Sequence, residues 1–484
     1  MSSKDEKGGD HKFSEEYMVL KPQGGHSWDL LHLLFSHNVD INKFVECSEG
    51  MKVHGVKNRW ILVLSVILQK ILHRLAKPMY WLGWVIETYL NLVFNYDNLS
   101  SFLFGLLHGK LVILDKSSAK YMSTIGNFDT RFELYKNIKN GDPRYHGALS
   151  AVAAKLAYEN EALVKDTITN KWKMDFLGFY NFWDDFQDEA STQAYMFQDR
   201  KDDPELVVVA FRGTEMFSAV DWSSDFDISW YGLLGIGKIH GGFMKALGLQ
   251  KGLGWPQDLK QPENDKRMFA YYTLREKLKD ILRKNEKAKV IVTGHSLGGA
   301  LAIVFPTVLA FHKEDLLLKR FEGVYTFGQP RVGDEKLGEF LKEKLRINGV
   351  KYLRYVYCND LIPRVPFDNK SFLFKHFGTC LYFNSLYQGK VVEVEPNKNY
   401  FNPAKVLLMS LTGGFELIRC FFIGYVMGPE YSETWCMALL RLFSGMIIPG
   451  LPAHFPREYL NVTRLASSNI YDIPPDQTVD LPTR

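Results

Sequence analysis

From residue 144 onward, the chain alternates between short apolar runs and longer segments in which apolar residues recur at helical spacing. Four runs have the length and the β-branched or aromatic content of buried strands: 205–214, 290–293, 323–327 and 351–357. The helical segments are 144–158, 266–282, 335–343 and one beginning at 300. Strands that alternate with helices predict an α/β fold with a mostly parallel sheet, whose functional sites lie at the carboxyl ends of the strands.

A long apolar and basic region precedes this pattern. On a helix, residues 60–77 would carry a stripe of leucine and isoleucine and, on the opposite side, three basic side chains: Lys70, Arg74 and Lys77. Pro78 is expected to end this helix, so that 79–94 forms a second apolar arm. Because neither arm reaches the roughly 20 apolar residues of a membrane span, we expect both to lie in a lipid interface. Packing on protein is the alternative.

Residues 385–450 interrupt the alternation of strands and helices. The apolar run 406–426 carries Glu416 and Arg419 on one face, and 436–448 is a further apolar run. We expect both runs to be helices that cover the active site or contact lipid, with core packing as the alternative.

These patterns divide the chain into four parts. Residues 1–50 are expected to be disordered or loosely structured, and 51–125 to form the apolar, basic helical region that associates with lipid. Residues 126–470 are expected to form the catalytic α/β domain, and 471–484 an extended tail.

Composition narrows the classes of function. A net charge of +4 over 484 residues is too small to favour nucleic-acid binding. The five cysteines are scattered without a Cys-x-x-Cys pair, so they indicate neither a zinc site nor a disulfide framework. The charged N-terminus lacks the apolar core of a secretory signal, which favours a cytosol-facing protein. An aromatic content of 14% suggests an apolar ligand or surface.

The sharpest chemical signal follows the strand at 290–293. Residues 294–298 read Gly-His-Ser-Leu-Gly and lead into an apolar helix. This pattern predicts a nucleophile elbow, a tight turn that exposes the Ser296 hydroxyl and needs small residues at Gly294 and Gly298. The turn also leaves the N–H of Leu297 available to a developing oxyanion.

A serine nucleophile needs a histidine base and an acid that orients it. In α/β hydrolases both follow the serine in the chain. Asp360 stands in the turn just past the strand at 351–357 and is the predicted acid, whereas Asp334 suits a helix cap and Asp368 a turn.

Three histidines follow the nucleophile. His454 lies in a proline-rich stretch that presents the imidazole from a loop, and it is the predicted base. His376 is flanked by aromatic residues and suits a core position, although it remains the second candidate. His312 lies at the far end of the elbow helix.

A second oxyanion donor is expected at the end of the earlier strand. Thr214, in the Gly-Thr turn after this strand, offers both its hydroxyl and its N–H. The segment 215–238 that follows has no clear period and is a candidate lid.

Six short motifs together resemble the class 3, fungal-type triacylglycerol lipases. In chain order they are Phe211-Arg-Gly-Thr214, Asp221-Trp222, His240-Gly-Gly-Phe243, Gly294-His-Ser-Leu-Gly-Gly299, Phe327-Gly-Gln-Pro-Arg-Val-Gly333 and Asp360-Leu-Ile-Pro363. The C-terminal stretch 454–464 and the apolar N-terminal region resemble the plant oil-body lipase branch.

This resemblance implies an α/β-hydrolase fold and a serine lipase acting on long-chain acylglycerols, most of all triacylglycerol, at a lipid–water interface. It implies a triad of Ser296, Asp360 and His454, an oxyanion hole of Thr214 and Leu297, and a structural role for His376. It also implies a location on lipid droplets. The chemistry requires no metal or organic cofactor, and the aromatic surface would also suit a homo-oligomer. A phospholipase A1 or diacylglycerol lipase of the same fold and a catalytically silent scaffold are the alternatives.

Overall fold

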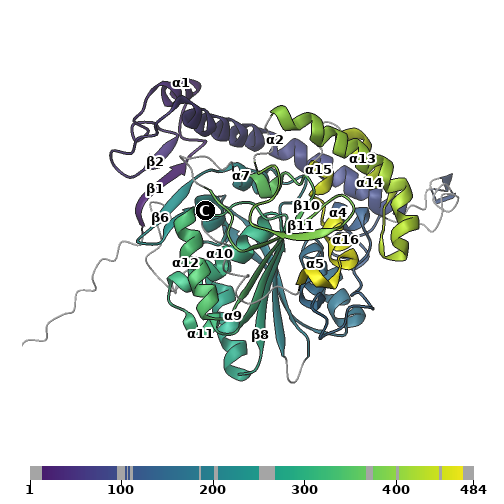
Figure 1. Cartoon of the computed structure of the whole chain (residues 1–484). Coiled ribbons are helices and arrows are strands. Elements are labelled where there is room, and N and C mark those ends of the chain that lie inside the picture. The colour runs from purple at the N-terminus through teal and green to yellow at the C-terminus, as the bar shows by residue number, and fades with distance from the viewer. Residues whose placement is uncertain are drawn as a thin grey trace, which may run out of the picture.

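A computed structural model of the chain describes residues 14–94, 104–105, 107–108, 113–184, 187–200, 205–249, 267–366, 374–398, 403–445, 448 and 450–471. An eight-stranded sheet, in the order β12-β11-β10-β9-β8-β5-β4-β3, forms its centre (Figure 1). Its strands are β3 Asp175–Asp184, β4 Glu189–Gln198, β5 Leu206–Phe211, β8 Lys289–His295, β9 Phe321–Phe327, β10 Lys351–Tyr357, β11 Thr379–Phe383 and β12 Gly389–Val392. The neighbours from β5 to β11 pair in parallel, and the two ends of the sheet are antiparallel. The predicted α/β fold with a mostly parallel sheet is therefore confirmed.

Helices cover both faces of this sheet (Figure 1). One face carries α8 Gly241–Ala246, α9 Ala270–Lys284, α10 Leu297–Phe311, α11 Asp315–Leu318 and α12 Glu335–Ile347. The other carries α5 Tyr145–Leu156, α6 Glu161–Asp166, a π-helical turn at Thr167–Lys171 and α16 Pro456–Leu465. The predicted helices correspond to α5, α9, α10 and α12, while the β3–β4 hairpin and the strands β11 and β12 had no counterpart in the sequence prediction.

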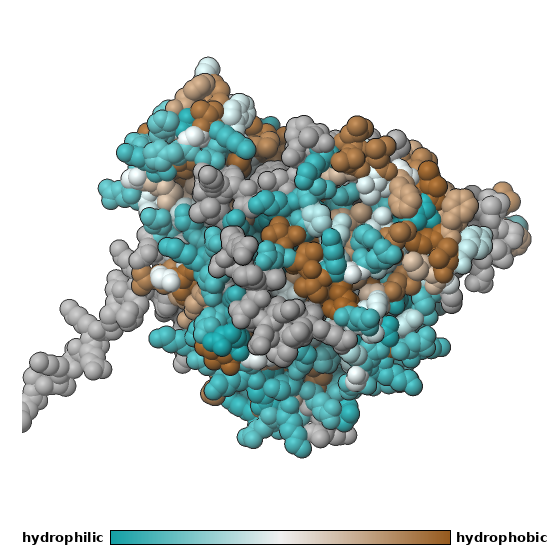
Figure 2. All heavy atoms as spheres, in the orientation of Figure 1, coloured by the Kyte–Doolittle hydropathy of each residue, from teal (hydrophilic) through white to brown (hydrophobic). Residues whose placement is uncertain are grey.

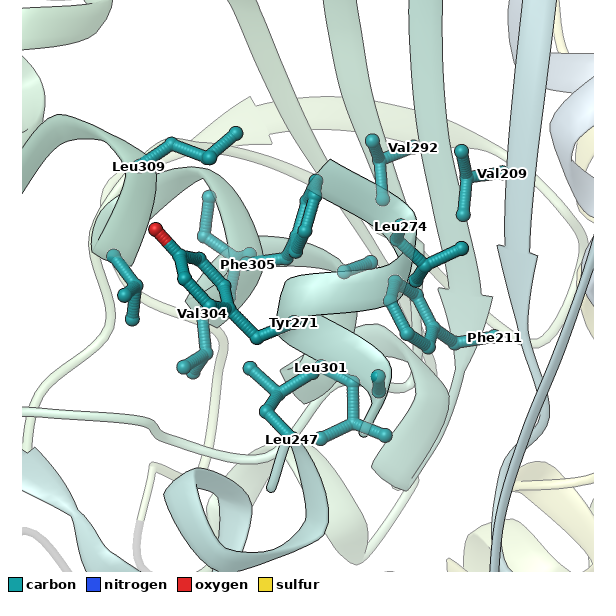
Figure 3. Packing of buried hydrophobic residues seen from close by; sticks show 14 of the residues in the cluster. Val209, Phe211, Leu247, Tyr271, Leu274, Val292, Leu301, Val304, Phe305 and Leu309 are labelled. Atoms are coloured by element: carbon teal, nitrogen blue, oxygen red, sulfur yellow. The ribbon is translucent and has the colours of Figure 1, made fainter. Parts of the chain in front are cut away.

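The elbow helix α10 lies in the larger of the two cores. Its residues Leu301 and Phe305 are fully enclosed between strands β5 and β8 and helix α9 (Figure 3). Tyr271 of α9 packs on Phe305 with ring centroids 5.8 Å apart. Because α10 is apolar on every side, it is buried on every side, and this rigid packing fixes the turn at its first residue.

A small antiparallel sheet stands at one end of the molecule. It has the order β2-β1-β6-β7, with β1 Ser14–Leu20, β2 Val45–Cys47, β6 Trp230–Leu233 and β7 Gly237–His240. The segment up to residue 50 was expected to be disordered or loosely structured. From Ser14 onward that expectation is wrong, because β1 pairs with β6 and buries Met18, Val19 and Leu20. Helix α1 Ser27–Phe35 follows, and residues 1–13 lie outside the described residues.

The two predicted apolar arms are a single helix, α2, Val56–Phe94, with Pro78 in its interior. The expected break at Pro78 is wrong because packing holds both halves in line. The first half buries Leu62 and Val66 against the small sheet. In the second half Asn91 donates to the carbonyl oxygen of Met122 (2.7 Å) and accepts from its N–H (2.9 Å). Lys70 also differs from expectation, since its ammonium donates to the carbonyl oxygens of Pro22 and Gly25.

The insertion in the C-terminal part forms two helices that lie beside α2 (Figure 1). They are α13 Pro403–Met427 and α14 Trp435–Ser444, followed by the short α15 Gly450–Ala453. Within α13, residues Leu407–Met427 are long and apolar enough to cross a membrane by length and composition. The remaining described elements are α4 Thr124–Phe128, α7 Ala219–Phe226 and three short 3₁₀ helices: Ile362–Arg364, Gly428–Glu430 and Ser468–Tyr471. The predicted tail, from residue 472 on, lies outside the described residues.

Candidate active site

Ser296 occupies the turn between β8 and α10 in a conformation that side-chain-bearing residues rarely adopt. Its backbone has φ 58° and ψ −128°, a region that costs about 1–3 kcal/mol and persists only where the surroundings enforce it. The backbone leaves no room for a side chain at either flanking glycine. A Cβ on Gly294 would collide with the backbone of Gly298, and a Cβ on Gly298 would collide with the carbonyl oxygen of Phe211.

The structure brings together the serine, histidine and acid that the sequence predicted. The Ser296 hydroxyl donates to Nε2 of His454 at 2.8 Å. Nδ1–H of His454 donates to both oxygens of Asp360, at 2.9 Å and 2.8 Å. A carboxylate only accepts, so the proton sits on Nδ1 and leaves Nε2 free to take the serine proton.

Asp360 is fully buried at the end of β10, where several groups orient its carboxylate. The N–H of Ile362 donates to Oδ1 at 2.9 Å, and the hydroxyl of Tyr459 donates to Oδ2. Tyr459 lies on α16, directly after the loop that carries His454. The sequence prediction did not include Tyr459, whose distance of 99 positions from Asp360 left no local signal.

Gly328 gives the acid and base room to meet. It follows β9 with φ +59°, and a Cβ there would stand 2.8 Å from Oδ2 of Asp360 and 2.9 Å from Cε1 of His454. Only glycine combines this backbone conformation with this space. Gly328, in the motif that begins at Phe327, therefore serves the site by having no side chain.

His295 holds the loop of His454 by a hydrogen bond to its backbone. Its Nε2–H donates to the carbonyl oxygen of His454 at 2.7 Å, and its Nδ1 accepts from the hydroxyl of Tyr158 at 2.8 Å. Burial, and then the neighbouring charge of His454, hold the pKa of His295 well below its usual value. A neutral ring can donate from one nitrogen and accept at the other, as both contacts require. The sequence prediction had assigned no role to either His295 or Tyr158.

The end of β5 lies against the elbow, as expected of an oxyanion donor. A Cβ on Gly213 would collide with the carbonyl oxygen of His295, so the turn that carries Thr214 is adjacent to the nucleophile. The hydroxyl of Thr214 donates to Oδ2 of Asp225 at 2.6 Å. Leu297 is the first residue of α10. The backbone N–H groups in the first turn of a helix have no acceptor within the helix, so the N–H of Leu297 can donate elsewhere.

The candidate lid, 215–238, contains helix α7 and the β6–β7 hairpin up to residue 238. Helix α7 packs on α2, where Gly83 lies against Phe217 and the Ser65 hydroxyl donates to the carbonyl oxygen of Phe226 at 2.6 Å. The guanidinium of Arg212 donates to Glu215 at 2.5 Å and to Asp221 at 3.4 Å, which ties the start of this segment to the end of β5.

Helix α7 carries two enclosed carboxyl groups, of which Asp221 is buried and Asp225 is half-buried with its Oδ1 shielded from solvent. Burial raises the pKa of Asp225 to about 7, against the hydrogen bond from Thr214. Burial likewise raises the pKa of Asp221 to about 6, against the attraction of Arg212.

A cavity of about 570 Å³ lies between α2 and the catalytic domain. Its wall includes Trp81 and Trp84 of α2, Met216 and Phe217 of the candidate lid, and Tyr158. Since the Tyr158 hydroxyl also bonds His295 of the nucleophile elbow, the side chain of Tyr158 connects the cavity wall to the elbow.

The other acids and histidines considered have structural roles. Nε2 of His376 contacts the carbonyl oxygen of Pro363 at 2.6 Å, and His312 contacts the hydroxyl of Tyr271 at 2.6 Å. Asp334 caps α12 by accepting from the N–H of Leu337. Asp368 lies outside the described residues. No cluster of three His, Cys, Asp or Glu side chains suited to a metal ion occurs within the described ranges.

Comparison with known proteins gives consistent results. The family called lipase (class 3) matches residues 208–370, which include Ser296, Asp360 and Thr214. Triacylglycerol lipase OBL1 of Nicotiana tabacum is 37% identical over 94% of this chain and 95% of its own length. The protein of the same name from Arabidopsis thaliana is also 37% identical, again over 94% of this chain and 95% of its own.

Among solved structures, the triacylglyceride lipase of Rhizomucor miehei aligns at 22% identity and a TM-score of 0.36. That alignment covers 50% of this chain and 79% of the fungal one. The likeness to the two plant proteins extends over nearly the whole chain and includes the region that carries the nucleophile elbow, so the chain belongs to the class 3 lipase family.

Proposed function

We propose that this protein is a serine lipase that hydrolyses long-chain acylglycerol esters, triacylglycerol above all. The observation that carries the proposal is the continuous hydrogen-bonded chain from Ser296 through His454 to Asp360 at the carboxyl ends of β8 and β10. The names of the two plant relatives support the choice of triacylglycerol as substrate.

In the proposed reaction, the Ser296 oxygen attacks the ester carbonyl carbon while Nε2 of His454 takes its proton. Asp360 stabilises the imidazolium and keeps Nδ1 protonated. His454 then returns the proton to the leaving glycerol oxygen, which leaves an acyl-enzyme. Water activated by His454 attacks the acyl carbon, and the fatty acid leaves with Ser296 restored.

The oxyanion formed in each step would be held by the N–H groups of Leu297 and Thr214, together with the Thr214 hydroxyl. In the structure the single hydrogen of the Thr214 hydroxyl goes to Asp225, so the hydroxyl would serve the oxyanion when a protonated Asp225 donates to the Thr214 oxygen instead. A protonated Asp225, favoured by its burial, would avoid placing a negative charge beside the developing oxyanion.

We also propose that 215–238 acts as a lid and that the cavity behind it accepts part of the substrate. Helix α7 contacts both the oxyanion candidate and α2, so its movement would couple the two. Trp81 and Trp84 offer an apolar wall for an acyl chain.

The proposed location is the surface of a lipid droplet. Helix α2 supports it, because one side of this helix presents a row of exposed apolar residues: Trp60, Leu64, Ile71, Leu75 and Tyr89. Arg74 and Lys77 are also exposed on α2 and suit anionic headgroups.

The first test compares the wild type with Ser296→Ala on emulsified triolein, diolein and phosphatidylcholine, by titrating released fatty acid. We expect the wild type to release fatty acid from triolein. The turnover of the variant should be lower by a factor on the order of 10⁴ to 10⁶. Ser444→Ala is the matched control, because the Ser444 hydroxyl bonds a carbonyl of its own helix.

Other outcomes would change the proposal. Cleavage of diolein or phosphatidylcholine alone would retain the triad and shift the substrate to diacylglycerol or phospholipid. A folded wild type that cleaves none of the three would favour a silent scaffold.

A further inference from the structure

Helix α13 turns its apolar side outward and its charged side inward, which is the opposite of a surface helix of a water-soluble protein. Its outward side carries large apolar residues at helical spacing: Leu407, Leu408, Leu411, Phe415, Ile418, Phe421, Phe422, Tyr425 and Val426. Tyr425 is 90% exposed, more than any of the other eight. The inward side instead buries the charged residues Glu416 and Arg419. Single exposed apolar residues are ordinary, but a continuous row with the charges turned inward requires an explanation.

Helix α14 continues the same surface. The residues that it exposes are all apolar: Trp435, Leu439, Leu442 and Phe443. Its arginine, Arg441, is turned inward and is 1% exposed. Among the side chains that the structure describes on the two helices, Lys405 is the only exposed charge. Figure 2 shows these residues as a brown region along the upper right of the molecule, over α13 and α14.

A buried ion network fixes this orientation. Arg441 donates to Glu416 of α13 at 2.9 Å and to Glu458 of α16 at 2.6 Å. Arg419 donates to the hydroxyl of Tyr357, at the end of β10, at 3.0 Å. Burial would raise the pKa of Glu458, but Arg441 and its neighbouring arginines outweigh burial and hold the pKa below its usual value. Turning either helix outward would break the buried ion pair between Arg441 of α14 and Glu416 of α13.

The contact between Ser296 and His454 excludes a membrane-spanning α13, although the length of this helix would allow one. Ser296 precedes α13 in the chain and His454 follows it, so a span would place the two on opposite sides of a membrane. The 10 residues of α14 reach only about 15 Å, too short for a return crossing of a hydrocarbon core about 30 Å thick. The hydrogen bond between Ser296 and His454 therefore requires α13 to lie on one side.

We propose that the outward faces of α13 and α14 dock into the acyl layer of a phospholipid-coated neutral-lipid surface, with both helices parallel to that surface. This inference rests on the proposed function and adds a second contact to that of α2. The two surfaces are continuous, because Phe94 at the end of α2 contacts Trp435 at the start of α14 with ring centroids 6.3 Å apart. In Figure 1, α2 and α13 run along the same side of the molecule as α15, which precedes His454.

The chemistry of this surface fits lipid better than a second copy of the chain. It carries no exposed acid among its described side chains, and Lys405 lies at one end. Tyr425 and Trp435 lie near the connection between the helices, and such aromatic residues prefer the boundary between headgroups and acyl chains. A fluid acyl layer accepts a row of bulky side chains without requiring a complementary protein surface.

The test is flotation of the purified full-length protein with triolein droplets coated with phosphatidylcholine. The variant Ile418→Gln with Phe422→Gln changes two exposed residues one helical turn apart on α13. The control Leu316→Gln with Ile347→Gln changes two equally apolar, exposed residues on α11 and at the end of α12. We expect the α13 variant to lower the droplet-bound to free ratio at least tenfold and the control to change it less than twofold.

A water-soluble short-chain ester separates this inference from the proposed function. Both variants should hydrolyse it within twofold of the wild type, since neither touches the triad. An α13 variant that hydrolyses the soluble ester and floats like the wild type overturns the docking surface and leaves the lipase intact. If the wild type cleaves no ester, the proposed function itself fails.

Oligomeric state in lipid-free solution provides the remaining outcome. If the wild type is a dimer, and the α13 variant is a monomer that still floats normally, the surface is a contact between copies and the lipid proposal is wrong.

Discussion

One carboxyl group connects the oxyanion candidate to the candidate lid. Asp225 is half-buried in α7 and accepts a hydrogen bond from Thr214, whereas the helix otherwise faces α2. An acid that loses most of its hydration on folding is more easily accommodated as the neutral form, which is why its pKa rises. The protonation of this residue therefore affects both the stability of α7 and the charge beside Ser296.

We predict that Asp225→Asn changes the dependence of stability on pH. The folded-state pKa of about 7 lies above the unfolded value of 3.8, so the folded protein binds the proton more tightly. The stability from this proton is fully present below about pH 4 and is lost as pH rises through about 7. The loss is at most about 1.4 kcal/mol per pH unit in that window.

The measurement is thermal unfolding of both proteins from pH 4 to pH 8. As pH increases, the melting temperature of the variant should rise relative to that of the wild type. Asp166→Asn on the exposed side of α6 is the control and should run parallel to the wild type. A constant difference between Asp225→Asn and wild type across the range would contradict the raised pKa.

At the scale of elements, the helices that follow the sheet are held by charge and not only by apolar packing. Arg441 alone contacts Glu416, Glu433 and Glu458, which belong to α13, the following connection and α16. The last of these helices carries Tyr459 and so reaches the acid of the triad. Arg441 therefore links the insertion to the helix that carries Tyr459.

We predict that Arg441→Met destabilises the protein by about 3–5 kcal/mol, because it removes a buried cation that pairs with the buried carboxylates of Glu416 and Glu458. Urea unfolding followed by tryptophan fluorescence measures this. The control Arg346→Ala breaks an exposed pair with Glu343 on α12 and should cost less than about 1 kcal/mol. A change for Arg441→Met as small as that of the control would show that the network contributes little.

At the scale of the whole molecule, the helices proposed to meet lipid, α2, α13 and α14, lie on the same side of the molecule as α7 and α15 (Figure 1). Helix α2 lies between the proposed lipid surface and α7, and its Ser65 hydroxyl holds the carbonyl oxygen at the end of α7. Insertion of α2 into lipid would thus act directly on the element that covers the cavity.

We predict that specific activity on tributyrin rises several-fold when its concentration passes the solubility limit, because the closed lid is favoured in water. Ser65→Ala removes one hydrogen bond from that closed state, so it should raise activity below the limit by roughly two- to tenfold. Thr412→Ala, whose hydroxyl bonds a carbonyl within α13, is the control. A flat response of the wild type across the limit would indicate an open site.

Much of the active site was predictable because the chemistry that specifies it is local. The small residues at Gly294 and Gly298 follow from the steric demands of one turn, and Asp360 follows from its place after a strand. His454 was predicted from the prolines around it. In each case neighbours within a few positions determine the conformation, so the sequence alone determined the alternation of the central parallel strands with their helices, the elbow turn and the three residues proposed as the triad.

Tertiary structure decided what depends on partners distant in the chain. Packing at both ends kept α2 continuous through Pro78, and pairing with β6 made a strand of a segment expected to be loose. Tyr459 meets Asp360 across 99 positions. The turning of Glu416 and Arg419 inward, with the apolar side of α13 outward, required Arg441 and Tyr357 to be in place. Periodicity shows that a helix has two sides, but only the groups that satisfy its charges determine which side faces the protein.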